Sequence, residues 1–446
     1  MGAVMSGKGR PRTIGDLRRA GYKVVPVREE LRRNLVARMR SGDNVFPGII
    51  GYDDTVIPQL YNAILAGQDV ILLGERGQAK SRLIRSLVGL LDEEVPMIAG
   101  CEINDNPFAP ICRACQLKVA EAGDEVELEW LPREARYAEK LATPDISIAD
   151  LIGEVDPIKV AEGRYLSDEL TIHYGLIPRT NRGIFSINEL PDLAERIQVG
   201  LFNLMEERDV QIKGYRLRLP LDIFVVASAN PEDYTNRGRI ITPLKDRYGA
   251  QIRTHYPRSL EDEIAIAEQE RSRLPDESRL VFPHYMKEIL AEITALARRS
   301  PDVNQRSGVS VRVTIANYET LAANAFRRMI RLNEELAVPR ITDLPSLAAS
   351  FTGKVELESF EEGRELRLLE ELTKKAVLAT FGRYLNVREL EPVTQKFEEG
   401  LVVETGAEMP AREYMDLFRQ VDGLSQVVKR LGADEPVAYV VEPKID

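Results

Sequence analysis

The chain has 446 residues, of which 44% are hydrophobic and 29% are charged, and this balance is typical of a soluble globular protein with about two to four domains. No apolar run approaches the roughly 20 residues of a membrane span, and the first residues lack the apolar core of a signal peptide, so we expect a cytoplasmic protein without a membrane partner. The net charge of −11 argues against a dominant nucleic-acid surface, and we expect no nucleic-acid partner.

Residues 1–44 are expected to form a basic helical segment. Arginines cluster in one short stretch of it: Arg28, Arg32, Arg33, Arg38 and Arg40. Such a cluster is typical of a solvated helix face, which is the interpretation we favour, and a subunit-contact or anion-binding face is the alternative.

Residues 45–256 alternate short apolar runs with segments of helical periodicity. Strands that alternate with helices favour a mostly parallel sheet covered on both faces, so we expect an α/β domain here. The predicted strands are 69–74, 95–100, 183–190 and 222–230, the predicted helices are 80–91 and 193–208, and a β-hairpin is predicted over 210–220.

The pattern changes after residue 256. Residues 257–350 have helical periodicity throughout, which predicts a separate all-helical domain. Residues 351–446 mix helical segments with polar loops, and we expect a mainly helical C-terminal extension.

The three cysteines of the chain, Cys101, Cys112 and Cys115, lie in a predicted insertion at residues 101–140. One C-x-x-C pair with an outlying cysteine is half of a zinc site, and the fourth ligand would have to be His173 or a carboxylate. Because structural zinc sites usually show paired C-x-x-C spacing, we favour three reduced thiols as the interpretation, with zinc as the alternative.

The stretch GERGQAKS, residues 74–81, almost fits the phosphate-binding pattern G-x-x-x-x-G-K-[ST]. It follows a predicted strand and opens a predicted helix, as the motif requires. Loop N–H groups and the helix N-terminus would hold phosphates, Lys80 would reach the β- and γ-phosphates, and Ser81 would ligate Mg²⁺. The expected nucleotide-binding residues are Gly74, Glu75, Arg76, Gly77, Gln78, Ala79, Lys80 and Ser81.

Ala79 stands where the pattern has its second glycine. Gly74 and Gly77 still supply backbone freedom, and residue 79 at the start of a helix would need only a negative φ angle. A methyl group removes no N–H donor, so we expect a working phosphate loop.

Polar residues lie at the ends of two further predicted strands. Asn188 and Glu189 stand where an active ATPase usually has Asp-Glu, the aspartate holding the waters of Mg²⁺ and the glutamate polarising the attacking water. We expect Glu189 to be the catalytic base and Asn188 to keep an oxygen for the metal, with weaker metal binding because it lacks the charge. Asn230 would hold the water that Glu189 activates.

Two arginines are candidates for contact with the γ-phosphate. Arg247, in ITPLKDRYG, suits an arginine finger, with a surface salt bridge as the alternative. Arg312, at the start of a predicted helix in the second domain, would reach back to the γ-phosphate, and Arg306 competes for that role.

The series of phosphate loop, strand ending in glutamate, asparagine after a strand, L-x-D-R-[FY]-G and helical domain resembles the AAA+ ATPases, specifically the clade of magnesium chelatase subunit I and the MoxR-like ATPases. FPGIIGYDDTVIPQLYNAILAGQDVILLG and GRYLSDELTIHYGLIPRTNRGIFSINELPDL are similar to that clade, and VQIKGYRLRLP falls where the clade inserts a β-hairpin. The resemblance covers residues 45–350 and departs at Asn188. It implies an AAA+ P-loop domain over 45–256 and a helical lid over 257–350.

By resemblance, such proteins bind ATP with Mg²⁺ and assemble as rings, commonly hexamers, in which the arginine finger acts on the neighbour's nucleotide. They work with partners that carry a von Willebrand factor A domain. We therefore expect an ATP-hydrolysing, MoxR-like chaperone that remodels a partner protein or loads a metal or cofactor into it. The alternatives are the motor subunit of magnesium chelatase, which inserts Mg²⁺ into protoporphyrin IX, and a nucleotide-sensing scaffold with little hydrolysis.

Overall fold

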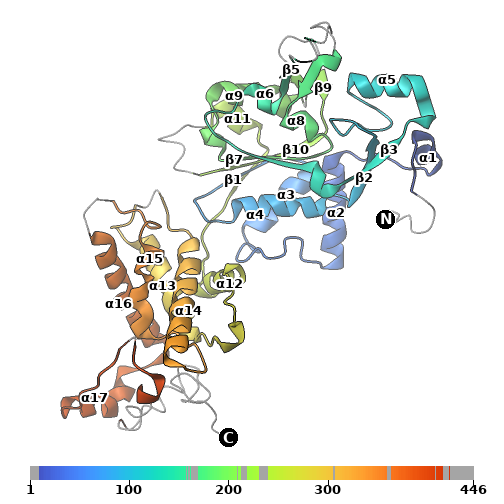
Figure 1. Cartoon of the computed structure of the whole chain (residues 1–446). Helices are drawn as coiled ribbons and strands as arrows, with labels where there is room; N and C mark the ends of the chain where they lie inside the picture. Colours follow the sequence, from blue (N-terminus) through green and yellow to red (C-terminus); the bar gives the residue numbers. More distant parts are fainter. Residues whose placement is uncertain are drawn as a thin grey trace. The chain divides into compact units, whose positions relative to one another are not determined.

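The computed structural model describes residues 10–156, 158, 161, 169–207, 209–211, 218–230, 240–304, 307–358, 363–406, 408–414 and 421. The chain divides into two compact units, Met1–Gly74 with Ala79–Thr254 and Glu75–Gln78 with His255–Asp446. The first unit holds a parallel sheet, and the described elements of the second are helical (Figure 1). None of the helices within the described residues is long and apolar enough to cross a membrane.

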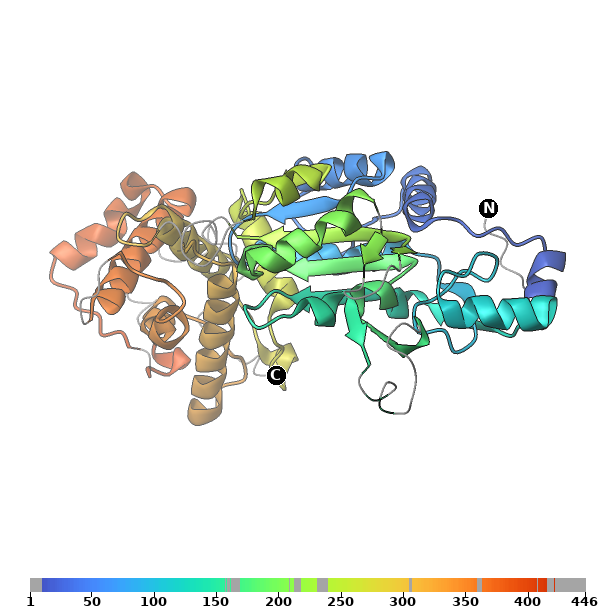
Figure 2. The ribbon, with the colours of Figure 1, turned by 90° about the horizontal axis from the view of Figure 1, so that it is seen from above.

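A five-stranded sheet forms the centre of the first unit (Figure 2). Every neighbouring pair of strands is parallel, which confirms the predicted α/β fold with a mostly parallel sheet. Because parallel strands end at one shared edge, the residues that follow the central strands come together there. The strands, in spatial order, are β11 (Ala250–Arg253), β1 (Val70–Leu73), β10 (Ile223–Ala229), β7 (Gly183–Asn188) and β4 (Tyr137–Leu141).

Alternate residues of the central strands point into two apolar cores, one on each face of the sheet. In β10, Val225 and Ala227 belong to one core, whereas Phe224 and Val226 belong to the other. Helices cover both faces, as expected for a buried parallel sheet. The helices within the described part of this unit are α1 (Ile14–Arg19), α2 (Val27–Ser41), α3 (Val56–Ala66), α4 (Lys80–Ser86), α5 (Arg113–Ala122), α6 (Ile148–Leu151), α8 (Leu176–Arg179), α9 (Glu195–Gly200), α10 (Phe202–Glu206) and α11 (Thr242–Arg247), with short 3₁₀ turns η1 (Leu87–Leu90), η2 (Gly123–Glu125), η3 (Arg133–Arg136), η4 (Glu169–Thr171) and η5 (Leu190–Asp192).

The predicted strand 95–100 is not part of the central sheet. It forms β2 (Glu94–Ile98), which pairs antiparallel with β3 (Leu128–Pro132) in a separate two-stranded sheet. Pro96 in its middle has no N–H to donate, and proline is confined to edge strands for that reason. The place in the central sheet is taken by β4, which begins inside the predicted insertion 101–140 and ends at Leu141.

Two further small pairs of strands lie in the described part of the first unit. The strand β8 (Asp209–Gln211) pairs antiparallel with β9 (Arg218–Pro220), as expected for the predicted hairpin, whose turn lies outside the described residues. The strand β5 (Gly153–Val155) pairs antiparallel with β6 (Ile172–Tyr174).

The two predicted helices of this unit are shorter than expected. The helix 80–91 ends as α4 at Ser86 and continues as the 3₁₀ turn η1. The helix 193–208 is divided into α9 and α10 around Gly200 and Leu201. Gly200 weakens the middle of a helix, and a Cβ atom at this position would lie 2.6 Å from Cδ1 of Ile148, so its lack of a side chain permits close packing there.

Four of the five arginines of α2, Arg28, Arg32, Arg33 and Arg38, are partly buried and have partners, so the predicted fully solvated face is not observed, whereas Arg40 is exposed. Arg28 pairs with Asp69, and Arg33 binds the two carboxylate oxygens of Asp92 at 2.5 and 2.6 Å. Other arginine side chains of α2 donate to carbonyl groups near the ends of neighbouring helices, and these carbonyl groups have no partner within their own helix. Two further arginines donate to backbone carbonyls at 2.7 and 2.6 Å, Arg32 to Leu65 and Arg38 to Gly89.

The second unit has its own apolar core, to which its long helices contribute. The long helix α13 is amphipathic, with Ile289, Leu290 and Ile293 buried. The described elements of this unit confirm a helical region after the sheet. They are α12 (Leu260–Glu270), α13 (His284–Arg299), α14 (Arg312–Leu332), α15 (Ala348–Phe351), α16 (Arg364–Tyr384) and α17 (Glu391–Glu398), with 3₁₀ turns η7 (Glu277–Arg279), η8 (Ile341–Leu347) and η9 (Val387–Leu390).

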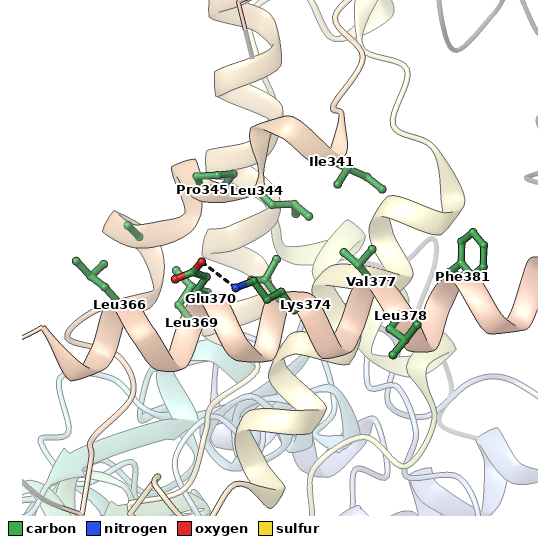
Figure 3. Close-up of a pocket in the computed structure, with 12 residues that line it drawn as sticks. Ile341, Leu344, Pro345, Leu366, Leu369, Glu370, Lys374, Val377, Leu378 and Phe381 are labelled. Carbon is green, nitrogen blue, oxygen red and sulfur yellow. Dashed lines mark hydrogen bonds and ion pairs between the residues drawn. The ribbon is translucent and has the colours of Figure 1, made fainter. Parts of the chain in front are cut away.

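Helix α16 leaves part of its apolar surface open. Leu366 and Leu378 are 52% and 71% exposed. Together with η8 and α15, the helix borders a groove of about 820 Å³ (Figure 3). An ion pair between Glu370 and Lys374, at 3.0 Å, lies along it. The groove is mostly apolar and lacks a convergent set of polar groups of the kind that marks a catalytic site.

Candidate functional site

The candidate phosphate loop is the connection from β1 to α4. Gly77 and Ala79 both have positive φ angles, of 74° and 53°. The expectation of a negative φ for Ala79 is therefore wrong, because the chain enters α4 through a left-handed residue. This conformation costs an L-residue about 1–2 kcal/mol, and such strain is typical of functional loops.

Lys80 is the first residue of α4 and is 7% exposed. Its Nζ donates a hydrogen bond to the carbonyl oxygen of Gly74 at 2.5 Å and another to Oδ1 of Asn230 at 2.7 Å. Both of these acceptors are neutral, so they orient the ammonium group without cancelling its charge. A buried cation at the opening of a helix is suited to hold an anion.

Asn230 joins Lys80 to Glu189. The Oδ1 of Asn230 accepts from Lys80, while its Nδ2 donates to Oε2 of Glu189 at 2.6 Å. Glu189 follows β7 and has a left-handed backbone, with φ 55° and ψ 46°. The structure therefore brings together three predicted site residues that come from three different segments, and it places the carboxylate at the shared edge of the sheet.

Asn188 uses both ends of its amide. Its Nδ2 donates to Oε1 of Glu139, and its Oδ1 accepts from the hydroxyl group of Ser228 at 3.2 Å. Glu139 lies on β4, which pairs with β7. Arg85 donates two hydrogen bonds to the Glu139 carboxylate, at 2.7 and 2.9 Å, and this interaction lowers the pKa of Glu139.

Sequence reasoning missed Glu139, which the structure places beside Asn188. The segment ARYAEKL that contains it is short and carries three charged residues, so it gave little sign of a strand in the central sheet. The recognisable signal would have been the alternation of Tyr137, Glu139 and Leu141 on one side of such a strand.

Arg247, at the end of α11, has partners within its own chain. Its guanidinium group pairs with the carboxylate of Glu206, donates to the carbonyl oxygen of Pro243 at 2.7 Å and lies 4.7 Å from the ring centroid of Phe202. The salt bridge that the sequence offered as the alternative is therefore present. The contact with a neighbouring subunit's nucleotide stays a prediction.

Arg312 is the first residue of α14 and is exposed. It belongs to the second unit, and its predicted contact with the γ-phosphate stays a prediction. Arg306, the competing candidate, lies outside the described residues.

The three cysteines lie together in the first unit. The fourth group that joins them is Asp105, whereas His173 lies exposed on β6 and is not part of this cluster. The cluster is in the loop between β2 and α5 and in the first turn of α5.

The residues at the edge of the sheet fit a nucleoside triphosphate with Mg²⁺. The loop offers backbone N–H groups at a helix N-terminus, and Lys80 offers a buried positive charge. The hydroxyl group of Ser81, in the first turn of α4, and the carboxylate of Glu189 are oxygen ligands of the kind that Mg²⁺ prefers. The Oδ1 of Asn188 already accepts a hydrogen bond from Ser228, so its predicted place near the metal stays a prediction.

No family model matches the chain. Among similar proteins, the magnesium-chelatase subunit ChlI of Nostoc sp. is 26% identical over 261 residues, which cover 57% of this chain and 64% of that protein. The chloroplastic magnesium-chelatase subunit ChlI-2 of Arabidopsis thaliana is 27% identical over 265 residues, which cover 56% of this chain and 58% of that protein.

The chain resembles the magnesium-chelatase I subunits. This finding confirms the resemblance predicted from the series of motifs. The match spans less than two thirds of the length of these relatives. A solved structure of the complex between subunits BchI and BchD of magnesium chelatase has a TM-score of 0.37 at 19% identity, and the match covers 76% of this chain and 94% of that chain.

Proposed function

We propose that this chain is an AAA+ ATPase that binds ATP with Mg²⁺ and hydrolyses it. The observation that supports this proposal best is the hydrogen-bonded line from Lys80 through Asn230 to Glu189. It joins a phosphate-binding cation to a carboxylate base through the side-chain amide of Asn230, which accepts from the cation and donates to the carboxylate. A chance match to the loop pattern would not require these three residues to meet.

Each residue has a separate task in this proposal. Residues Gly74–Ser81 bind the phosphates, and Lys80 neutralises their charge. Glu189 takes a proton from the attacking water on its carboxylate, and Asn230 holds that carboxylate in place. Bound ATP supplies the phosphoanhydride bond that is broken. The buried surroundings of Lys80 and Asn230, which are 7% and 4% exposed, strengthen these electrostatic contacts.

The cellular role follows from the resemblance. We infer that the chain assembles as a ring, commonly a hexamer in this clade, and remodels a partner protein in the MoxR-like manner, with a von Willebrand factor A domain protein as its partner. A motor subunit of magnesium chelatase is the second candidate, and the names of the relatives favour it. A nucleotide-sensing scaffold with little hydrolysis is the third candidate, supported by Asn188 in place of an aspartate.

Two variants test the ATPase assignment. Lys80→Ala is expected to lose ATP binding in calorimetry, whereas Glu189→Gln is expected to keep ATP binding and lose turnover by about 10²–10⁴-fold, because an amide cannot take the proton. Glu195→Gln, at an exposed glutamate of α9, is the matched control and should hydrolyse ATP at the wild-type rate. Unchanged nucleotide affinity in Lys80→Ala would show that the loop is not the phosphate site.

Further measurements distinguish the three proposed cellular roles. A wild-type chain that binds ATP but shows no hydrolysis would favour the scaffold. Stimulation of Mg²⁺ insertion into protoporphyrin IX, with the other chelatase subunits added, would favour the chelatase motor. Stimulation of ATP hydrolysis by a protein with a von Willebrand factor A domain, without porphyrin, would favour the MoxR-like role.

A further inference from the structure

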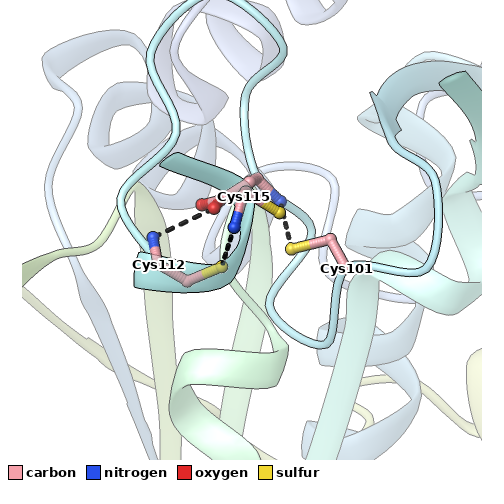
Figure 4. Close-up of side chains that lie close together, drawn as sticks. Cys101, Cys112 and Cys115 are labelled. Carbon is pink, nitrogen blue, oxygen red and sulfur yellow. Dashed lines mark hydrogen bonds between the residues drawn. The ribbon is translucent and has the colours of Figure 1, made fainter. Parts of the chain in front are cut away.

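Four potential metal ligands meet in the interior of the first unit. The sulfur atoms of Cys101, Cys112 and Cys115 and a carboxylate oxygen of Asp105 all lie within 4.8 Å of one another. Figure 4 shows the three cysteine side chains turned toward one another. The four residues are almost fully buried, with exposures of 9%, 4% and 1% for the cysteines and 0% for Asp105. Every cysteine of the chain is therefore in this one cluster.

Backbone N–H groups are directed at the cluster. The Sγ of Cys101 accepts from the amides of Ile103 and Asp105, at 3.4 and 3.3 Å, and the Sγ of Cys112 accepts from the amide of Cys115 at 3.3 Å. These donors favour the thiolate form of sulfur, which is the form that binds metals. Two of the three sulfur atoms thus have backbone donors directed at them.

The carboxylate of Asp105 is fixed in the same way. Its Oδ1 accepts from the amide of Ile111 at 3.1 Å and its Oδ2 from the amide of Cys112 at 3.0 Å. Hydrogen bonds to a ligating carboxylate orient it toward the metal, as outer-shell partners commonly do. A buried carboxylate beside three sulfur atoms would otherwise be costly, because burial disfavours a charge that nothing compensates.

We propose that Cys101, Asp105, Cys112 and Cys115 bind a single zinc ion. Three sulfur ligands and one oxygen ligand fill a tetrahedral shell, which is the geometry of structural zinc sites. With zinc–sulfur distances of about 2.3 Å, ligand atoms of such a shell lie about 3.8 Å apart, which is compatible with the spacing of this cluster. Thiolate ligands select zinc over the hard cations Mg²⁺ and Ca²⁺.

The position of the proposed zinc site, far from Glu189 along β7, indicates a structural role. The loop from Cys101 to the start of α5 contains no helix or strand and is tied by Asn104 and Asn181 to the segment before β7. Asn104 donates to the carbonyl oxygen of Arg179 at 2.8 Å, and Asn181 donates to that of Ile103 at 3.1 Å. The cluster is thus at the beginning of β7, whereas Glu189 follows its end. Zinc here fastens a loop and does not take part in the chemistry at the opposite edge.

The metal content of the full-length chain tests the proposal. Purified protein, dialysed against metal-free buffer, is expected to retain about one zinc ion per chain by elemental analysis, because a closed structural site releases zinc slowly. Cys112→Ser and Asp105→Asn should lower the zinc content severalfold. His173→Ala removes the other fourth ligand that the sequence offered, and it should leave the zinc content unchanged.

Cobalt replacement reports the ligands directly in the wild-type chain. The Co²⁺-loaded protein is expected to show the intense thiolate-to-cobalt absorption and the visible bands of tetrahedral coordination. This measurement holds even if Cys112→Ser fails to fold. Octahedral cobalt bands without thiolate absorption would overturn the proposal, and so would full zinc content in Asp105→Asn combined with loss in His173→Ala.

Thiol counting separates zinc from a disulfide. The metal-loaded chain should react slowly with a thiol reagent, and a strong chelator should expose all three cysteine thiols. Its melting temperature should also fall when the chelator is added. A chain free of zinc that shows three reactive thiols before chelation, or one thiol with a disulfide between the other two, would overturn the proposal.

Discussion

Asn188 shows how one residue can depart from a motif and still be fixed by its surroundings. Its amide must both donate and accept, because Glu139 lies on one side and the hydroxyl group of Ser228 on the other. An aspartate, which is usual at this place in active ATPases, can only accept and would set two carboxylates beside each other. The carboxylate of Glu139 on the neighbouring strand β4 thus favours asparagine over aspartate at position 188.

The first prediction concerns this contact. Asn188→Asp is expected to lower the free energy of unfolding at pH 7 by about 1–3 kcal/mol, because it replaces a donor with a like charge. The pair raises the pKa of one carboxyl group in the folded state above its unfolded value. The loss is therefore largest at neutral pH, where the unfolded carboxyl is ionised, and shrinks as the pH falls toward about 4.

Urea unfolding at pH 7 and pH 5 measures this loss. The double variant Asn188→Asp with Glu139→Gln restores a donor opposite the new carboxylate and should recover much of the stability, with Glu139→Gln alone as its control. The double-mutant cycle then gives a positive coupling. Equal effects at both pH values, with no coupling, would mean that the two side chains do not face each other.

At the scale of single residues, motif spacing predicted much of the candidate site. Lys80, Glu189 and Asn230 were each selected from their position after a strand, and the structure places them in hydrogen-bonded contact. Their roles in hydrolysis stay predictions. Glu139 was not predicted, because its partners Arg85 and Asn188 are far away in the sequence. Asp105 was covered only by the unspecified carboxylate that the sequence offered as a fourth zinc ligand. The predicted negative φ angle of Ala79 is wrong, since the motif alone does not give the sign of φ.

At the scale of elements, apolar periodicity identified the interior strands and missed the edges. The strands β1, β7 and β10 are buried apolar runs that the sequence shows plainly. The edge strands β4 and β11 contain charged or polar residues, because one side of an edge strand faces solvent. The strand β2 has the apolar pattern of an interior strand, yet Pro96 excludes it from that position.

The helix α2 shows a second limit of sequence patterns at this scale. Glu30 and Arg136 form a bidentate ion pair, at 2.7 and 2.6 Å, with side chains only 3% and 2% exposed. Arg136 also donates to the carbonyl oxygen of Arg182 at 2.7 Å, and Glu30 accepts from the amide of Asp92 at 2.6 Å. The pair links α2 to the segment that leads into β4, and neither residue stands out in the sequence.

The second prediction concerns this pair. Arg136→Ala is expected to lower the free energy of unfolding by about 3–5 kcal/mol, because it leaves the Glu30 carboxylate buried without its partner. Replacing both residues, as Glu30→Met with Arg136→Met, should cost less than Arg136→Ala alone, since no charge then stays buried.

Denaturant unfolding followed by circular dichroism measures these differences. Arg133→Ala, at a neighbouring arginine whose side chain is 32% exposed, is the matched control and should change stability by less than about 1 kcal/mol. A loss in Arg136→Ala no larger than that of the control would show that the buried pair does not hold α2 in place.

At the scale of the whole molecule, Arg247 is the residue at which the proposed ring can be tested. In this chain the guanidinium group is held by Glu206 and lies against Phe202, so the side chain is already oriented by its own subunit. An arginine finger must be positioned before it meets the neighbour's γ-phosphate, and in the proposed ring this contact would supply such positioning. Glu206 would then act through Arg247 as a positioning residue and would touch no nucleotide itself.

The third prediction tests this role in an assembled ring. Arg247→Ala subunits are expected to bind ATP normally and to hydrolyse it roughly 10³–10⁵-fold more slowly, because the arginine stabilises transition-state charge on the neighbouring site. Glu206→Gln keeps the arginine but loosens it, so its rate should fall by a smaller factor with unchanged ATP affinity. Lys80→Ala subunits alone should be inactive, since they lack the phosphate-binding cation.

Mixing the two inactive variants decides whether Arg247 acts between subunits. In a mixed ring, an Arg247→Ala subunit has an intact phosphate loop, and a Lys80→Ala neighbour offers an intact Arg247 to it. Partial ATPase activity should therefore appear in mixtures and pass through a maximum at intermediate ratios, measured where light scattering shows assembly. An Arg247 that acts within its own subunit cannot be supplied by a neighbour, so inactivity at every ratio in demonstrated mixed rings would refute the contact between subunits and leave Arg247 as a structural or same-subunit residue.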